Sequence, residues 1–354
     1  MRALKNILVT GGAGFIGTNF IRYLFEQSDF DGRVVNLDAL TYAGNPLNLK
    51  DIEEAQGNRY IFEHGDITNP ELITRLLSQY EIDTVVHFAA ESHVDRSIYG
   101  PQAFVQTNVI GTFTLLEAVR AAWTDRGDVL FHHVSTDEVF GSLGAEGYFT
   151  EETPYDPRSP YSASKASSDH FVRAYHETYG LPITVSNCSN NYGPFQFPEK
   201  LIPVMIFNMI DGKPLPVYGD GKNIRDWLYV EDHSTAIWAI LTKAETGATY
   251  NVGGENEWQN IDLVRRLCEL VADATGASAQ EYLDLISFVT DRPGHDRRYA
   301  IDCGKIKSDL GWSQSVTFDQ GLQQTIRWYL DNPDWVQQVK SGEYRDWVAK
   351  HYGA

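Results

Sequence analysis

Two residues near the middle of the chain have the types and spacing needed for proton transfer. Tyr161 and Lys165 stand at positions i and i+4 of the segment Tyr-Ser-Ala-Ser-Lys, so on a helix both side chains project from one face. An ammonium group beside a phenol stabilises the phenolate and lowers the tyrosine pKa. The pair therefore predicts a tyrosine that can take a proton from a hydroxyl group.

The spacing of this pair is weak evidence by itself, because the chain has 19 tyrosines and many lysines. Tyr218 and Lys222 have the same spacing, but they enclose Gly219-Asp220-Gly221, which is a poor helix former. The catalytic interpretation of Tyr161 therefore depends on the elements that surround it.

Two adjacent carboxyl groups follow a predicted strand in Ser135-Thr136-Asp137-Glu138. An isolated pair of acids is most often a solvated loop. Beside a tyrosine base and a hydride acceptor, however, such a pair suits an elimination, in which one acid removes a proton from carbon and the other protonates the departing hydroxyl. Asp137 and Glu138 are thus candidate catalytic residues together with Thr136.

A glycine-rich turn near the N-terminus predicts a dinucleotide site. The apolar run 6–10 leads into Gly11-Gly12-Ala13-Gly14-Phe15-Ile16-Gly17, and an amphipathic helix follows. Glycines also form ordinary loops, but between a strand and a helix they let backbone amides approach a pyrophosphate. Asp38 ends the next predicted strand, where its carboxylate can bond ribose hydroxyls and repel the extra phosphate of NADP. These features together favour NAD as the cofactor.

Two further strand ends are expected to form the floor of the cofactor groove. His64-Gly65-Asp66-Ile67 follows the third predicted strand, and His87-Phe88-Ala89-Ala90 ends the fourth. In open parallel sheets such strand ends line the crevice in which a dinucleotide lies.

The elements that must position these residues alternate between strand and helix. Strands are predicted at 6–10, 33–38, 59–63, 82–89, 128–135 and 183–188. Helices are predicted between them at 15–27, 70–80, 101–123 and 161–179. This alternation predicts an α/β fold with a Rossmann-type doubly wound parallel sheet.

The regular alternation ends near residue 188, where Gly-Pro-rich pieces begin. We expect an NAD-binding Rossmann domain at 1–188, with a returning segment near 224–252, and a second domain in the rest of 189–354. The second domain should be a smaller mixed α/β lobe with helices at 262–274, 318–330 and 335–351.

Composition excludes several other classes of protein. The net charge of −19 is spread along the chain, which argues against nucleic acid or an anionic membrane as partner. No apolar stretch reaches the length of a membrane span, and no signal peptide precedes the glycine turn, so a cytoplasmic location is expected. The three cysteines, Cys188, Cys268 and Cys303, have no C-x-x-C spacing. They predict buried reduced thiols and no metal site.

These motifs resemble the extended short-chain dehydrogenase/reductases and, more narrowly, the dTDP-glucose 4,6-dehydratases. The resemblance covers essentially the whole chain. It rests on TGGAGFIG (10–17), DALTYAGN (38–45), AAESHVDRS (89–97), STDEVFG (135–141), PYSASKASSDH (160–170), NCSNNYGPFQFPEKLIP (187–203), RDWLYVEDH (225–233) and RPGHDRRYAID (292–302). Phe140 departs from the tyrosine that is usual in this family, and we expect it to pack.

The resemblance implies a redox-neutral dehydration in which NAD stays bound. Tyr161, assisted by Lys165 and Thr136, takes the proton of the sugar 4-hydroxyl while hydride passes from carbon 4 to NAD. Glu138 then removes the carbon 5 proton as Asp137 protonates the leaving 6-hydroxyl, and hydride returns to carbon 6. The product is a 4-keto-6-deoxy sugar nucleotide.

The resemblance also implies that the second domain, in 189–354, binds the sugar nucleotide, and it implies the binding residues and a homodimer. Cofactor contacts are expected from Gly11, Gly14, Phe15, Ile16, Gly17, Asp38, Leu40, Thr41, Asp66, Ile67, Ala89, Ala90, Ser92, Thr107, Tyr161, Lys165 and Asn191. Contacts to the nucleotide sugar are expected from Ser92, Thr136, Asn190, Lys200, Leu201, Pro216, Val217, Tyr218, Arg225, Asn260, Arg292 and His295. The homodimer is expected to form through the helices at 101–123 and 161–179.

Alternatives remain open at this point. A nucleotide-sugar 4-epimerase would use the same cofactor and tyrosine without the acid pair, and a dehydratase could act on another nucleoside-diphosphate hexose. An inactive NAD-sensing protein would need the glycine turn alone. Arg225, whose planar guanidinium suits phosphate oxygens, could instead form a salt bridge with Asp226, and His295 could be part of a structural turn.

Overall fold

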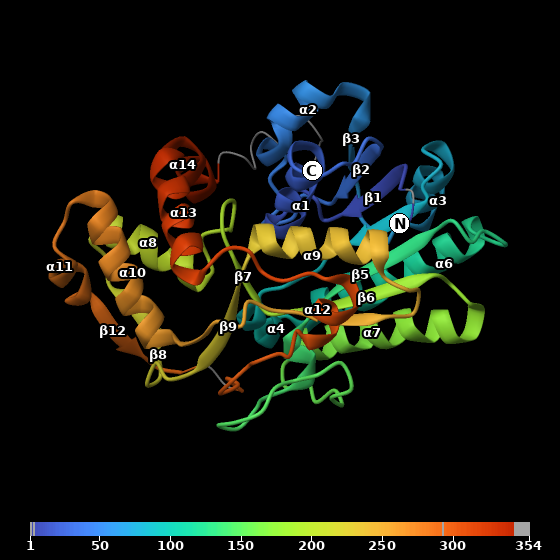
Figure 1. Cartoon of the computed structure of the whole chain (residues 1–354). Coiled ribbons are helices and arrows are strands. Elements are labelled where there is room, and N and C mark those ends of the chain that lie inside the picture. Colours follow the sequence, from blue (N-terminus) through green and yellow to red (C-terminus); the bar gives the residue numbers. More distant parts are fainter. Residues whose placement is uncertain (1, 3, 292–293, 343–354) are drawn as a thin grey trace.

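A seven-stranded parallel sheet forms the centre of the molecule (Figure 1). The computed structural model describes residues 2, 4–291 and 294–342. The strand order is β10-β6-β5-β4-β1-β2-β3. The strands are β1 (Asn6–Thr10), β2 (Arg33–Asp38), β3 (Tyr60–His64), β4 (Thr84–His87), β5 (Leu130–Thr136), β6 (Ile183–Cys188) and β10 (Thr249–Val252). The order reverses at β1, which lies between β2 and β4, as in a doubly wound fold. The predicted fold class is confirmed.

Helices cover both faces of this sheet, because successive side chains of a strand point to opposite faces. Ile7 and Val9 pack with α1 (Phe15–Glu26) and α9 (Val230–Lys243) in one core. Leu8, between them, packs in the other core with α3 (Pro70–Gln79), α6 (Thr112–Ala122) and α7 (Pro160–Tyr179). The strands are therefore buried on both sides, and their carboxyl ends meet at one edge of the sheet.

The smaller lobe is built from two short sheets and a helical core. One sheet has the order β11-β9-β7 and the other pairs β12 with β8. Its strands are β7 (Asn190–Tyr192), β8 (Leu215–Tyr218), β9 (Ile224–Tyr229), β11 (Glu257–Gln259) and β12 (Ile286–Val289). Its core joins these strands to α8 (Leu201–Ile210), α10 (Asn260–Thr275) and α13 (Phe318–Asp331). Figure 1 shows this lobe beside the carboxyl edge of the main sheet.

The chain passes back from the smaller lobe to the main sheet. After β9 it forms α9, which contacts α1, and then β10, which pairs in parallel with β6. Residues 249–252 thus extend the sheet formed by the first half of the chain. The domain division at residue 188 stays a prediction.

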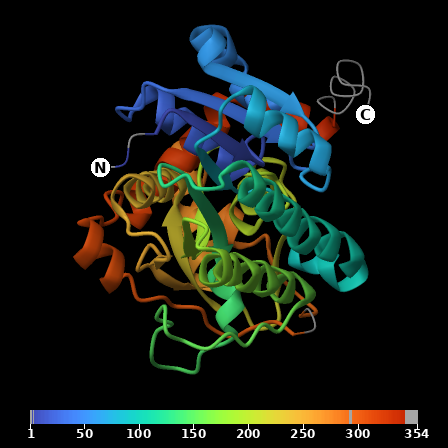
Figure 2. The same cartoon turned by 90° about the vertical axis from the view of Figure 1, so that its right-hand side faces the viewer.

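The remaining helices are short connecting or terminal elements. They are α2 (Lys50–Gln56), α4 (Val94–Tyr99), α5 (Pro101–Phe104), α11 (Ala279–Leu283), α12 (Gly304–Leu310) and α14 (Pro333–Ser341). The turned view in Figure 2 shows α6 and α7 side by side on one flank. Only the first part of the helix predicted at 335–351 is observed, as α14, which ends at Ser341 with Gly342 as its C-cap. Residues 343–354 lie outside the described part of the chain.

The helix predicted at 101–123 is observed over residues 101–122, but its winding changes along its length. It consists of α5, a π-helical stretch at Val105–Gly111 and α6. In this stretch the carbonyl oxygen of Asn108 accepts the hydroxyls of Thr112, at 2.6 Å, and of Ser168 on α7, at 2.6 Å. The Asn108 side chain also donates to Ser164 Oγ at 2.8 Å. The change of winding therefore coincides with contacts to α7, which apolar periodicity does not encode.

Three structural observations concern the cysteines, the metal-ligating side chains and the hydropathy of the helices. All three cysteines are buried and none forms a disulfide. Among residues 2, 4–291 and 294–342, no cluster of metal-ligating side chains is arranged to hold an ion. Within the same ranges no helix combines the length and hydropathy of a membrane span.

Candidate functional site

A cleft with about 330 Å³ of open space lies at the carboxyl ends of the central strands. Its volume falls in the range of small-molecule sites, about 300 to 1,000 Å³. Both lobes contribute to its lining, since Gly11 follows β1 and Asn190 begins β7. The cleft therefore occupies the crevice in which doubly wound sheets bind ligands.

The glycine turn is shaped for the close approach of a ligand's phosphates. Gly11 has a φ of +74°, and a Cβ built on it would lie 2.7 Å from the Ala89 Cα atom, so a larger residue cannot stand there. Gly14 is the N-cap of α1 and has no side chain to satisfy the first amides of the helix. These amide groups, with the positive end of the helix dipole, form an anion site at the cleft wall.

Asp38 is fixed at the end of β2. Its carboxylate oxygens accept the backbone amides of Ala13, at 2.9 Å, and of Leu40, at 2.8 Å. Burial raises the pKa of Asp38, and the two amides act against that rise. The carboxylate lines the cleft one strand away from the glycine turn, where a ribose of the dinucleotide is expected.

The acid pair lies at the end of β5 and faces the cleft. Thr136 caps a short 3-10 helix at Asp137–Phe140, and its hydroxyl accepts the amide of Glu138 at 3.3 Å. Phe140 is buried and stacks on Phe149, with ring centroids 5.2 Å apart, so the expected packing is confirmed. The same turn that buries Phe140 thus presents both acids to the cleft.

Asp137 is prepared to hold a proton. Its side chain is buried, and its Oδ2 atom has no hydrogen-bond partner in the described part of the chain. Burial, together with the charges of Glu138 and Asp226, raises the pKa of Asp137 well above its usual range. A carboxyl group that stays protonated at neutral pH can act as a general acid.

Helix α7 carries Tyr161 and Lys165 in its first two turns. The helix begins at Pro160, and a capping box between Ser159 and Ser162 fixes its first turn. Tyr161 and Lys165 are 9% and 4% exposed, and both line the cleft. The pair is therefore placed opposite the acids of β5 by a well-defined helix start.

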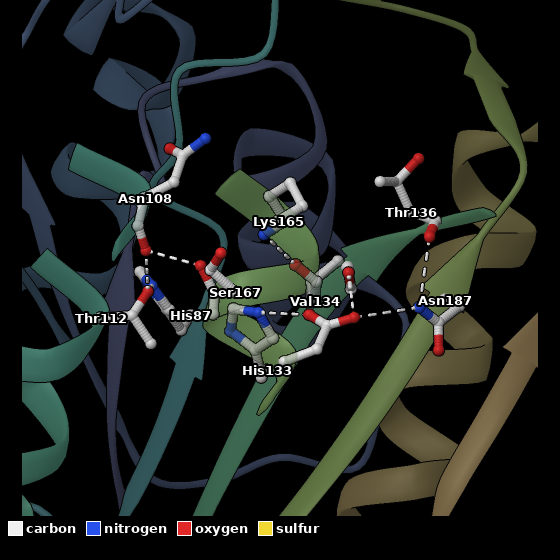
Figure 3. A network of polar contacts seen from close by, with 12 residues as sticks. His87, Asn108, Thr112, His133, Val134, Thr136, Lys165, Ser167 and Asn187 are labelled. Carbon is white, nitrogen blue, oxygen red and sulfur yellow. Dashed lines mark hydrogen bonds and ion pairs between the residues drawn. The ribbon is translucent and has the colours of Figure 1, made fainter. Parts of the chain in front are cut away.

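The sequence predicted that Lys165 lowers the pKa of Tyr161, and this direction was wrong. Burial raises the pKa of Tyr161 well above its usual value, and the charges of Glu138, Cys188 and Asp137 act in the same direction. A hydrogen bond with Thr136 opposes the rise. The Lys165 Nζ atom donates to the Val134 carbonyl at 2.9 Å, as Figure 3 shows. Burial and nearby negative charges therefore dominate the pKa of Tyr161.

Most of the predicted cofactor residues meet in this cleft. The lining includes all five candidate catalytic residues, Thr136, Asp137, Glu138, Tyr161 and Lys165. It also includes Gly11, Gly14, Phe15, Ile16, Gly17, Asp38, Thr41, Asp66, Ile67, Ala89, Ala90, Ser92, Thr107 and Asn191. Leu40 is the exception, because its side chain packs with Ala13 and not in the cleft wall.

The predicted substrate residues form two groups. Ser92, Thr136, Asn190 and Lys200 line the cleft. Leu201, Pro216, Val217, Tyr218, Arg225, Asn260 and His295 do not line it and belong to the smaller lobe or the segment beside it. Arg292 lies outside the described residues.

Arg225 is buried, and its guanidinium contacts backbone carbonyl oxygens and an aromatic ring. Its guanidinium donates to the carbonyl oxygens of Ile224, at 2.7 Å, and of Asp296, at 3.0 Å. It also lies 4.2 Å from the Tyr299 ring centroid. The Asp226 carboxylate instead accepts the amides of Gly254 and Asn256 at 3.0 and 2.6 Å.

His295 contacts both Asp291 and Tyr218. His295 Nδ1 lies 2.6 Å from Asp291 Oδ1, and the ring centroids of His295 and Tyr218 are 6.2 Å apart. Tyr218 ends β8, and residues 219–222 form a turn, so the Tyr218 and Lys222 spacing is not helical.

Several lining residues were not predicted individually. They include Tyr42, Glu91, Gln196, Phe197 and Glu199. The Arg96 guanidinium lies 3.7 Å from the Tyr42 ring centroid, and Phe197 meets the Tyr42 ring edge to face. These residues come from three loops, and no local spacing in the sequence brings those loops together.

Comparisons with known proteins agree with this geometry. Residues 8–325 match the family model described as GDP-mannose 4,6 dehydratase. The chain is similar to the dTDP-glucose 4,6-dehydratase of Salmonella typhimurium, with 53% identity over 360 residues, which cover 98% of each protein.

Two solved structures are also similar over almost the whole chain. The dTDP-glucose 4,6-dehydratase of Bacillus anthracis, solved in complex with NAD, has 47% identity and a TM-score of 0.84 and covers 95% of this chain and 99% of that one. The enzyme DesIV, a dTDP-glucose 4,6-dehydratase of Streptomyces venezuelae with NAD and TYD bound, has 45% identity and a TM-score of 0.85 and covers 94% and 99%.

Proposed function

The chain belongs to the GDP-mannose 4,6 dehydratase family of extended short-chain dehydrogenase/reductases, and on that basis we propose that it dehydrates dTDP-glucose to dTDP-4-keto-6-deoxyglucose. The observation that carries the proposal is the meeting of Asp137, Glu138 and Tyr161 in the cleft that also holds the glycine turn. A redox group, a base and an acid pair can then act on one hexose ring.

NAD fits the residues of this cleft. The uncapped first amides of α1 suit its pyrophosphate, and Asp38 suits the adenosine ribose. A Cβ at Gly11 would lie 2.7 Å from the Ala89 Cα atom, so only glycine allows the turn that presents these amides. When bound, NAD supplies a hydride acceptor for carbon 4 and a hydride donor for carbon 6.

Tyr161 is the base for the first half of the reaction. It takes the proton of the 4-hydroxyl, and the Thr136 hydroxyl bonds the same phenol. Because burial raises the pKa of Tyr161, positive charge is needed near the phenolate, and Lys165 is the ammonium group four residues along the helix. The resulting 4-ketone makes the carbon 5 proton acidic.

The two acids divide the elimination of water between them. Glu138 removes the carbon 5 proton, and Asp137 gives its proton to the departing 6-hydroxyl, which leaves as water. This assignment follows the surroundings, because Asp137 is fully enclosed and holds its proton. Glu138 gives its proton back to carbon 5 as carbon 6 is reduced, and carbon 4 remains a ketone. The proton that Tyr161 took is released to solvent and Asp137 takes up another, so both groups are ready for the next turnover.

The nucleotide diphosphate is proposed to extend from the cleft toward the smaller lobe. Asn190 and Lys200 lie at the cleft and would contact the sugar end. Arg225 is proposed to bond phosphate oxygens, with Leu201, Pro216, Val217, Tyr218, Asn260, Arg292 and His295 around the nucleotide. Since the chain has a net charge of −19, such local cations and helix N-termini must attract the ligand.

The decisive experiment offers dTDP-glucose, UDP-glucose and GDP-mannose to the purified protein and follows the mass of each. Loss of one water from dTDP-glucose alone is the expected result. Isomerisation with no mass change would indicate a 4-epimerase, and water loss from another sugar would indicate a different nucleotide preference. Binding of NAD with no change in any sugar would indicate a non-catalytic role.

We also propose that two copies of the chain associate through α6 and α7. Apolar side chains on this flank are solvent-exposed in the single chain, including Val105 at 52%, Phe113 at 40% and Phe171 at 39%. Phe113 and Phe171 form a pair with ring centroids 6.2 Å apart. Exposed apolar clusters of this kind are typical of subunit interfaces. The two-domain division and the cytoplasmic location stay predictions.

A further inference from the structure

The buried carboxylate of Asp169 lies close to the end of β5, which carries the acid pair. Asp169 stands on α7, one turn after Lys165, and its side chain is 0% exposed. One of its oxygens accepts the hydroxyls of Ser135 and Tyr155, each at 2.8 Å. His133 Nε2 lies 3.1 Å from the other oxygen. The reaction scheme above assigns no role to this group.

These contacts reach the backbone that carries the acid pair. Ser135 precedes Thr136 at the end of β5. On β6, the Asn187 amide donates both to Asp169 Oδ2, at 3.4 Å, and to the Thr136 carbonyl, at 3.2 Å. Figure 3 shows Asn187 bridging toward Thr136, with Lys165 and His133 on the other side of the same network. Through these bonds Asp169 holds the ends of β5 and β6 in place.

The second consequence is electrostatic. The Lys165 ammonium is buried and donates to the Val134 carbonyl, and an isolated ammonium in such a place tends to lose its proton. Burial lowers the pKa of Lys165, and the charge of Asp169 raises it again. His133 supplies no competing positive charge, since burial and the charge of Lys165 lower its pKa to about 4.

Asp169 itself is an anion. Burial alone raises its pKa, but the contact with His133, the charge of Lys165 and the hydrogen bond from Ser135 act more strongly in the opposite direction, and the pKa is lowered. The surrounding elements carry other titratable groups that a pH study must consider. They are His87 on β4, His133 on β5, Asp137 and Glu138 after β5, Cys188 on β6, and Tyr155, Tyr161 and Arg173 around or on α7.

We propose that Asp169 is a positioning residue for the dehydration, which keeps Lys165 protonated and holds the strand end that carries Thr136. The proposal rests on the proposed function, because it concerns the step in which Tyr161 takes the sugar proton. In this proposal the Asp169 carboxylate supplies the negative charge that keeps the buried Lys165 ammonium protonated for its role with Tyr161.

The test compares Asp169→Asn with Tyr155→Phe, using the protein with its bound NAD and dTDP-glucose. Asparagine keeps the size and an acceptor oxygen but removes the charge, whereas Tyr155→Phe removes one hydrogen bond to the carboxylate and keeps the charge. If activity requires protonated Lys165, the alkaline limb of the pH profile of kcat should move to lower pH by at least about one unit in Asp169→Asn, the scale of a neighbouring charge. Tyr155→Phe should leave that limb in place, although its Tm falls.

A merely structural role for Asp169 predicts a different result. Both variants would then lower the Tm, and the alkaline limb would stay where it is in the unmodified protein. That outcome would overturn the proposal, as would an equal shift in Tyr155→Phe. If the unmodified chain dehydrates none of the sugars, the proposed function fails, and the stability comparison below decides the role of Asp169.

A stability measurement keeps the inference testable even where Asp169→Asn is poorly folded. Removal of the carboxylate alone leaves a buried cation, so the double variant Lys165→Met/Asp169→Asn should have a higher Tm than Asp169→Asn. A double variant whose loss of Tm equals the sum of the two single losses would show that the two charges are not coupled, and would overturn the proposal.

Discussion

Asp137 and Glu138 are neighbours in the sequence but have different surroundings. Asp137 is enclosed and its pKa is raised well above the usual range, whereas Glu138 is partly accessible at the cleft. Different environments are the means by which adjacent carboxyl groups take up different protonation states. The proposed division of work between acid and base therefore rests on the different burial of these two residues.

Replacing Glu138 by Gln should stop the reaction after the first hydride transfer. Glutamine cannot take the carbon 5 proton, so turnover should fall by about a hundredfold or more, the usual contribution of a general base. Reduced cofactor should accumulate when dTDP-glucose is added, and its absorbance is the measurement.

Two variants serve as controls for that experiment. Glu177→Gln changes an exposed glutamate farther along α7 and should leave turnover unchanged. Tyr161→Phe should prevent any reduction of the cofactor. Absence of reduced cofactor in Glu138→Gln, under conditions in which the unmodified enzyme works, would remove Glu138 from the elimination.

The raised pKa of Asp137 predicts a pH dependence of the elimination. The group can donate its proton below its pKa and loses that ability as the pH rises through it, so the elimination rate should fall on the alkaline side. Product formation in single-turnover experiments across the pH range measures this limb.

A substrate analogue separates this acid from other titrating groups. Fluoride at carbon 6 is a better leaving group than hydroxyl and needs less protonation, so the fluoro analogue should restore elimination in Asp137→Asn. It should not restore elimination in Glu138→Gln. Equal rescue of both variants would argue against distinct acid and base roles.

Among single residues, those that lie close together along the chain could be identified from the sequence. The Tyr161 and Lys165 pair, the acid pair and the glycine turn all lie in the cleft. Tyr42, Phe197 and Glu199 were not identified individually, because loops distant in the sequence bring them together. The direction of the Tyr161 pKa was also missed, since desolvation depends on packing that no spacing reveals.

Among the elements, α7 has the closest link to catalysis. Its capping box joins Ser159 and Ser162 and fixes the turn from which Tyr161 projects. Ser159→Ala should lower the free energy of unfolding by about 1 kcal/mol, with a range of roughly 0.5 to 2. Because the helix start then frays beside Tyr161, kcat should fall as well.

The smaller lobe offers a matched control for this prediction. Helix α13 begins with the same kind of capping box, between Thr317 and Gln320, in a part of the chain that does not line the cleft. Thr317→Ala should cost similar stability, measured by chemical unfolding, and leave kcat unchanged. Equal losses of kcat in both variants would indicate a general effect of stability.

The positions of elements were predictable where periodicity and turn residues agree. β1, β2 and β6 have the predicted bounds, and the other predicted strands differ by at most two residues at either end. The π-helical stretch at Val105–Gly111 was not predictable, because local spacing does not reveal tertiary contacts such as the bond from Ser168 on α7 to the Asn108 carbonyl. The mixed α/β character of the second lobe was predicted, but its individual strands were not, since they are short and irregularly spaced.

For the whole molecule, the exposed apolar flank of α6 and α7 predicts self-association. Phe171→Asp places a charge on that flank and should convert a dimer into a monomer, as measured by sedimentation equilibrium. Phe288→Asp changes an equally apolar residue on β12, 57% exposed, and should leave the assembly intact. A monomeric unmodified protein would contradict the proposed dimer.

The return of the chain through α9 to β10 has a consequence for any attempt to split the protein. β10 pairs along β6 from Thr249–Val185 to Val252–Cys188. A fragment that stopped after Cys188 would leave the backbone groups of β6 without their neighbour. Such an open parallel edge recruits other chains, so the isolated N-terminal piece should aggregate unless residues 224–252 are supplied in trans.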